Sequence, residues 1–250
     1  MIKARRRIGK AAGKAKRGVA RVVRTVVRKV AKKAAAKKKR LGPSVPLDVL
    51  RERLLGLYPV AYCELKHSNA FELLVATILS AQCTDERVNK TTPELFRRFP
   101  TPQAMAAATP EEIEALIKST GFFRNKTKSI LGAARRIVTE FGGRVPDTME
   151  EILTLPGVAR KTASVVLGNA FGKNEGIAVD THVMRLTQRW GFTKQTDPKK
   201  IEQELMAVLP REEWTSFSHR TIFHGRRVCD AKKPACSTCT LADLCPSASP

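Results

Sequence analysis

Lys161 is the residue best placed for chemistry, because it follows a tight turn with the sequence Leu155-Pro-Gly-Val-Ala-Arg-Lys. Asp147 or Thr148 can cap a helix ending near Leu155, and a helical pattern resumes over Thr162–Phe171. Backbone N–H groups at such a hairpin and at the start of its second helix lack partners, which favours phosphate binding. A lysine there can either act on a nucleic acid or simply contact its phosphate.

Asp180 is the second candidate, in the segment Val179-Asp-Thr-His-Val183. It precedes Val183, Leu186 and Trp190 at helical spacing, which predicts that Asp180 caps a helix. Capping leaves a carboxylate available to stabilise positive charge or to take part in proton transfer.

Four cysteines near the C-terminus follow the spacing C-x6-C-x2-C-x5-C: Cys229, Cys236, Cys239 and Cys245. Thiolates this close can hold a zinc ion or a [4Fe–4S] cluster, and the uneven spacing favours the cluster. Lys232 and Lys233, between the first two cysteines, can meet a phosphate backbone. Cys63 and Cys83 stand apart and are expected to be buried thiols.

The net charge of +23 is concentrated in residues 1–42, which contain 18 Lys and Arg and no acidic residue. Such an arm favours a polyanion, nucleic acid ahead of an anionic membrane. We expect it to be disordered alone and to become helical on a polyanion; it can also be a solvated tail or a transit peptide. No apolar run is long enough to cross a membrane, so a soluble, cytoplasmic protein is expected.

Long segments after Leu47 have a helical rather than an alternating period, so the predicted fold class is all-α. Helices are expected over Val49–Leu57, Phe71–Leu79, Thr91–Phe96, Lys126–Phe141, Asp180–Trp190, Pro198–Val208 and Trp214–Phe223. In the first, Leu50, Leu54 and Leu57 are expected to face inward. Asn69 with Glu72, and Thr109 with Glu112, have the spacing of helix N-caps.

Taken together, the hairpin lysine, Val179-Asp-Thr-His182 and the cysteine spacing make the chain similar to the endonuclease III family of the helix–hairpin–helix superfamily. Leu79-Ser-Ala-Gln-Cys-Thr-Asp85, Gly121-Phe-Phe-Arg-Asn-Lys126 and His224-Gly-Arg226 also resemble family segments. The likeness covers roughly residues 47–245 and leaves out the basic arm.

This resemblance implies two helical lobes with DNA bound in the cleft between them. Residues 63–174 would form a six-helix barrel that contains the helix–hairpin–helix. Residues 43–62 and 175–250 would form the other lobe, with a [4Fe–4S] cluster on the four cysteines.

The resemblance also assigns roles to single residues. Lys161 would be the nucleophile and Asp180 its acidic partner, while Gln82 and Phe122 would enter the duplex. The hairpin would contact DNA through Gly157, Ala159 and Arg160. The chain departs from the family at Phe122, where leucine is common, and at Ala159, where glycine is usual.

These roles predict a base-excision repair enzyme that removes oxidised pyrimidines from double-stranded DNA. A buried damaged base must be flipped out, with Gln82 and Phe122 filling the gap. Lys161 would attack C1′ as the neutral amine, forming a Schiff base from which β-elimination cleaves the abasic site.

Two other functions stay open: an adenine-mismatch glycosylase and a noncatalytic DNA-binding protein. The mismatch enzymes typically lack the lysine and carry a further C-terminal domain. We expect the protein to be a monomer that associates with DNA, which in a bacterium places it at the nucleoid.

Overall fold

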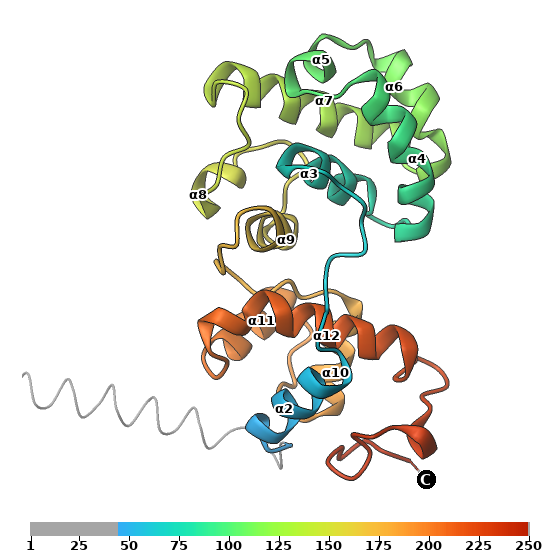
Figure 1. Cartoon of the computed structure of the whole chain (residues 1–250), viewed down its shortest axis with the longest axis vertical. Coiled ribbons are helices and arrows are strands. Elements are labelled where there is room, and N and C mark those ends of the chain that lie inside the picture. Colours follow the sequence, from blue (N-terminus) through green and yellow to red (C-terminus); the bar gives the residue numbers. More distant parts are fainter. Residues whose placement is uncertain (1–44, 250) are drawn as a thin grey trace, which may run out of the picture. The chain divides into compact units, whose positions relative to one another are not determined.

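The computed structural model describes residues 45–249 of the chain (Figure 1). The predicted basic arm, residues 1–42, lies outside the described residues.

The described part of the chain is built from α-helices and three short 3₁₀ turns, with loops between them. It contains no β-strand, so the predicted all-α class is confirmed for residues 45–249. In chain order the elements are α2 (Leu47–Leu57), α3 (Ala70–Leu79), α4 (Asp85–Arg98), α5 (Pro102–Ala107), α6 (Pro110–Ile117), η1 (Lys118–Thr120), α7 (Phe123–Glu140), α8 (Met149–Ile152), α9 (Arg160–Ala170), α10 (Thr181–Arg189), α11 (Pro198–Met206), η2 (Arg211–Glu213), α12 (Trp214–Arg227) and η3 (Cys236–Thr238).

Two separate hydrophobic clusters hold these helices. The first is centred on α3, in which every residue from Phe71 to Leu79 except Glu72 is buried, and also takes in side chains of α4 to α9. The second gathers α2 and α10 to α12 around the buried Trp190 and Phe217. Figure 1 shows the same two groups of helices, and α9 packs against α12 where they meet.

The helix-start signals in the sequence are confirmed. The Asn69 side chain accepts a hydrogen bond from the backbone N–H of Glu72 and begins α3. Thr109 and Glu112 form a complete capping box at the start of α6. Each such cap satisfies helix N–H groups that otherwise lack partners.

Two predicted helices were wrong in extent. The helix predicted over Thr91–Phe96 runs over Asp85–Arg98, because a Thr84 cap and acidic residues start it early and Pro93 does not end it. The helix before the hairpin is only Met149–Ile152.

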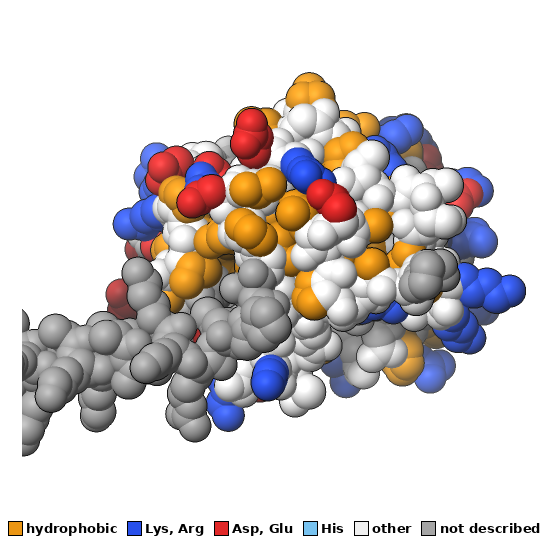
Figure 2. All heavy atoms as spheres, turned by 90° about the horizontal axis from the view of Figure 1, so that it is seen from below, with side chains coloured by type: hydrophobic (Ala, Val, Ile, Leu, Met, Phe, Trp, Pro, Cys, Tyr) orange, Lys and Arg blue, Asp and Glu red, His pale blue; other side chains and the backbone are white. Residues whose placement is uncertain are grey.

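Leu57 is 38% exposed rather than inward, while Leu50 and Leu54 are fully buried. It lies on the same face of α2 as Leu50, but as the last residue of the helix it stands at the edge of the packed region and is not covered there. Figure 2, turned by 90° from Figure 1 so that the molecule is seen from below, shows apolar side chains mixed with charged ones on that face. Cys63 and Cys83, predicted to be buried, are only partly buried against the first cluster.

Candidate active site

The hairpin joins the short helix α8 to α9 and rests on α7. Thr148 caps α8 by accepting from the Glu151 N–H, and Val158 N donates to Leu155 O at 3.2 Å to close the turn. At Ala159, the N-cap of α9, no side chain of the described residues makes a cap hydrogen bond. The first N–H groups of α9 are therefore left for solvent or an anion.

Gly157 is required at its position for two reasons. Its φ of 77° lies in the left-handed region, which glycine adopts without steric cost. A Cβ at this position would also lie 2.5 Å from Ser129 Cβ on α7. Ala159, by contrast, has an extended backbone with φ −91°, so its methyl group introduces no backbone strain.

Lys161 and Asp180 line one cavity, which encloses about 690 Å³ including its open mouth. Lys161 is exposed in the first turn of α9. Asp180 caps α10, as predicted, with Oδ1 accepting from the N–H groups of His182 and Val183 at 2.8 Å each. Two hydrogen bonds to one oxygen fix the carboxylate and leave Oδ2 to serve another group.

The wall of this cavity contains a buried histidine that the sequence did not single out. Asn169 Nδ2 donates to Val165 O at 2.7 Å, so its Oδ1 accepts from His219 Nε2 at 2.8 Å. Burial lowers the pKa of His219 from 6.5 to about 4, so the ring is neutral at pH 7 with Nδ1 as an acceptor.

Arg226 is a second lining residue that was missed, although its His-Gly-Arg segment was noted. From α12 it donates to Glu64 and, at 2.7 Å, to Asp85 Oδ2 at the start of α4. The Arg226–Asp85 ion pair therefore links α12, a helix of the second hydrophobic cluster, to α4, a helix of the first. Its partners are separated from it by 162 and 141 residues, so no local spacing could have indicated these contacts.

Gln82 and Phe122 lie on two different loops and share an unusual backbone. Their φ angles are 54° and 46°, and they are the two non-glycine residues of the described chain with positive φ. Both side chains are exposed, Phe122 by 64%. A non-glycine residue in the left-handed region costs about 1–2 kcal/mol, and such strain tends to occur at functional sites.

Arg160, predicted to contact DNA, makes an ion pair with α11. Its Nε donates to Glu202 Oε2 at 2.6 Å, and the Glu202 side chain is 6% exposed against 35% for Arg160. The partly exposed guanidinium is thus fixed at the first residue of α9, in the same turn as Lys161.

All four C-terminal cysteines line a second cavity of about 510 Å³. Arg189 Nη1 donates to Cys229 Sγ at 3.0 Å, and Leu241 N donates to Cys239 Sγ at 3.4 Å. Within residues 45–249, no three His, Cys, Asp or Glu side chains are arranged to hold a metal ion. The four thiols nevertheless line one space, and two of them, Cys229 and Cys239, receive N–H donors, as ligands of a metal cluster commonly do.

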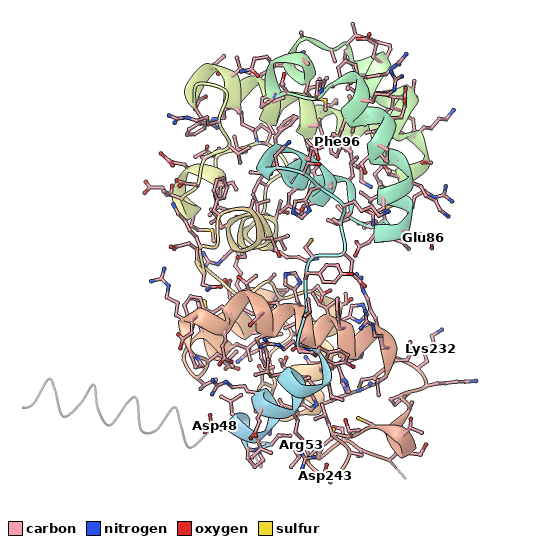
Figure 3. All side chains as sticks on the ribbon, in the orientation of Figure 1. Asp48, Arg53, Glu86, Phe96, Lys232 and Asp243 are labelled. Carbon is pink, nitrogen blue, oxygen red and sulfur yellow. The ribbon has the colours of Figure 1, made fainter. Side chains whose placement is uncertain are left out.

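Lys232, labelled in Figure 3, and Lys233 are exposed on the loop between the first two of these cysteines. Their backbone N–H groups donate to Asp230 Oδ1 at 2.8 and 3.0 Å, which shapes the loop and leaves both ammonium groups in solvent. In the part of the chain that is described, no helix is long and apolar enough to cross a membrane.

Residues 75–211 match the model of the HhH-GPD superfamily, described as base excision DNA repair proteins. The chain is 62% identical over 195 residues to an endonuclease III of Synechocystis, covering 78% of this chain and 89% of the relative.

Two solved structures agree with this. One, titled a non-covalent endonuclease III–DNA complex, has a TM-score of 0.77 at 43% identity, covering 81% of this chain and 94% of that one. Another, a trapped endonuclease III–DNA covalent intermediate, has a TM-score of 0.75 at 44% identity, covering 79% and 92%.

The chain belongs to the HhH-GPD superfamily of base excision DNA repair proteins, and within it to the endonuclease III family. The predicted resemblance is therefore confirmed, and with it the class of enzyme: a DNA glycosylase and abasic-site lyase.

Proposed function

We propose that Lys161 and Asp180 are the catalytic pair of this enzyme. The observation that carries the proposal is that both residues line one open cavity, each held at the start of a helix. Lys161 is exposed at the first turn of α9, where a DNA backbone bound to the hairpin can bring a sugar to it.

Base removal begins when the Lys161 Nζ lone pair forms a bond to C1′ of the flipped nucleotide. The glycosidic C–N bond breaks, its electron pair leaves with the base, and the base takes up a proton. The amine then loses one proton, the C1′–O4′ bond breaks with its electron pair going to O4′, which takes up a proton, and a protonated Schiff base forms between Lys161 and C1′. Asp180, whose Oδ1 is fixed by two N–H donors, stabilises the positive charge that develops on the sugar.

Strand cleavage follows from the Schiff base. Removal of a C2′ proton leaves an electron pair that forms a double bond and expels the 3′ phosphate, which is β-elimination. Asp180 can take part in this proton transfer through Oδ2. Water then hydrolyses the Schiff base and frees Lys161.

Gln82 and Phe122 are proposed to fill the space that the flipped nucleotide leaves. Gln82 can hydrogen-bond the orphaned base, and Phe122, with its ring 64% exposed, can wedge into the stack. The hairpin backbone at Gly157 and Ala159 would hold a phosphate, with the guanidinium of Arg160 beside it.

The C-terminal cavity is proposed to hold a [4Fe–4S] cluster on Cys229, Cys236, Cys239 and Cys245. The fit rests on four thiols lining one cavity and on the N–H groups that point at two of them. The cluster would supply a rigid anchor for the loop that carries Lys232 and Lys233, both of which would contact the phosphate backbone.

We further propose the division of the chain into a barrel lobe, 63–174, and a cluster lobe, 43–62 with 175–250. The two separate hydrophobic clusters support it. Duplex DNA with oxidised pyrimidines or abasic sites is the proposed substrate. The proposed cellular location is the bacterial nucleoid, where that DNA is.

Borohydride reduction tests the lysine assignment, because it converts a Schiff base with abasic DNA into a stable covalent complex. We expect trapping with the unaltered protein and none with Lys161→Ala. Lys199→Ala is the matched control, since Lys199 is also an exposed lysine in the second position of a helix, α11. Undiminished trapping with Lys161→Ala would rule out Lys161 as the nucleophile.

A further inference from the structure

Lys126 is a buried lysine in the first turn of α7 that the proposed chemistry does not use. The residue is 5% exposed, and its ammonium group is held by buried backbone carbonyls rather than by solvent. Nζ donates to Leu79 O and to Thr120 O, both at 2.8 Å. Burying a charged amine is costly unless it is hydrogen-bonded, so these two carbonyls account for its presence there.

The two carbonyls belong to the ends of two different segments. Leu79 is the last residue of α3, three residues before Gln82, and Thr120 is the last residue of η1, two residues before Phe122. Carbonyls at a helix end have no partner within the helix. Lys126 satisfies one from each segment and so joins loops that lie 40 residues apart in the sequence.

The joined loops are the ones that carry the two left-handed residues. Gln82 and Phe122 each hold a φ that their residue types disfavour, and such a conformation persists only where the surroundings impose it. The backbone of Lys126 also contacts the Phe122 loop, because the Lys126 N–H donates to Phe122 O at 3.1 Å. Its backbone therefore fixes the Phe122 loop and its side chain fixes both.

We propose that Lys126 is a positioning residue that fixes the spacing between the Gln82 and Phe122 loops, so that both side chains enter the duplex at one nucleotide. The proposal rests on the proposed role of these two residues in filling the duplex. Lysine suits the position because an ammonium group offers three donors at the end of a slender chain. Methionine has a similar shape and no donor, and so removes the link alone.

The test compares two substrates that differ in their need for base flipping. An abasic site in a duplex needs both loops, whereas an abasic site in a single strand offers its aldehyde to Lys161 without them. For Lys126→Met we expect kcat/KM on the duplex to fall at least tenfold and borohydride trapping on the single strand to stay within about twofold. Lys128→Met, an exposed lysine on the same helix, is the matched control and should leave both unchanged.

A second variant and a double-mutant cycle exclude a merely structural role. Lys126→Gln keeps an N–H donor and should recover part of the duplex activity; it also carries the test if the Met variant does not fold. In a Gln82→Ala, Phe122→Ala background, Lys126→Met should cost little more, because its effect passes through those two side chains.

A folded Lys126→Met variant whose ratio of duplex to single-strand activity is unchanged would overturn the proposal, whether both activities stay the same or both fall equally. The proposed function fails separately, if the unaltered protein is not trapped on either substrate.

Discussion

Some residues of the candidate site have a strained backbone, whereas others have a conformation that stabilises the fold. Gln82 and Phe122 hold left-handed backbones and expose their side chains, a cost in the free protein that their proposed insertion into the duplex would explain. Asp180 is unstrained: the two hydrogen bonds by which it caps α10 both stabilise the helix and orient the carboxylate. The orientation that the proposed catalytic role of Asp180 needs is therefore one that also stabilises the fold.

The buried His219 leads us to predict how the stability of the protein depends on pH. Its pKa is lowered from 6.5 to about 4 by burial, so the native protein leaves the ring neutral while the unfolded chain protonates it below about pH 6.5. Between those values the unfolded state binds more protons, and the free energy of unfolding rises with pH. We expect the protonation of His219 in the unfolded chain to lower the free energy of unfolding by about 2 kcal/mol between pH 7.5 and pH 5.

The measurement is denaturant unfolding of the protein and of His219→Gln at both pH values. The glutamine cannot take up a proton, so the variant should lose less stability at pH 5. If both proteins lose the same amount, another group is responsible for the acid sensitivity.

At the scale of elements, the sequence predicted the helices well wherever the signal was local. Each signal is complete within one short segment: Asn69 with Glu72 and the apolar run that follows it for α3, and Thr109 with Glu112 for α6. The contacts of Lys126 with Leu79, of His219 with Asn169 and of Arg226 with Asp85 span 47, 50 and 141 residues. Only the packing of helices brings such groups together, so spacing along the chain could not indicate them.

The hairpin gives a paired prediction about two neighbouring small residues. Gly157→Ala should lower the free energy of unfolding by at least about 2 kcal/mol, because a left-handed alanine is strained and its Cβ would overlap Ser129. Ala159→Gly should change it by less than about 0.5 kcal/mol, since Ala159 is exposed and extended. Thermal or denaturant unfolding of both variants measures this, and similar effects at the two positions would contradict it.

The whole molecule combines a compact helical enzyme with a strongly basic arm. The two hydrophobic clusters are joined by α9 against α12 and by the Arg226 ion pairs, and the cavity with Lys161 and Asp180 lies among these contacts. The family likeness accounts for this part of the chain. The arm, residues 1–42, has 18 positive side chains and precedes the segment that matches the family model.

The arm is expected to add electrostatic affinity for DNA without taking part in the chemistry. Each phosphate that a lysine or arginine neutralises makes the dependence of log K on log salt steeper by about 0.9. Deleting residues 1–42 should therefore make that dependence shallower by several such contacts and weaken binding most at low salt. Single-turnover cleavage at saturating enzyme should stay within about twofold, because Lys161 and Asp180 are unchanged. Binding titrations at several salt concentrations decide the point: an unchanged slope would mean that the arm does not contact DNA, and a lost single turnover would mean that it supports the site itself.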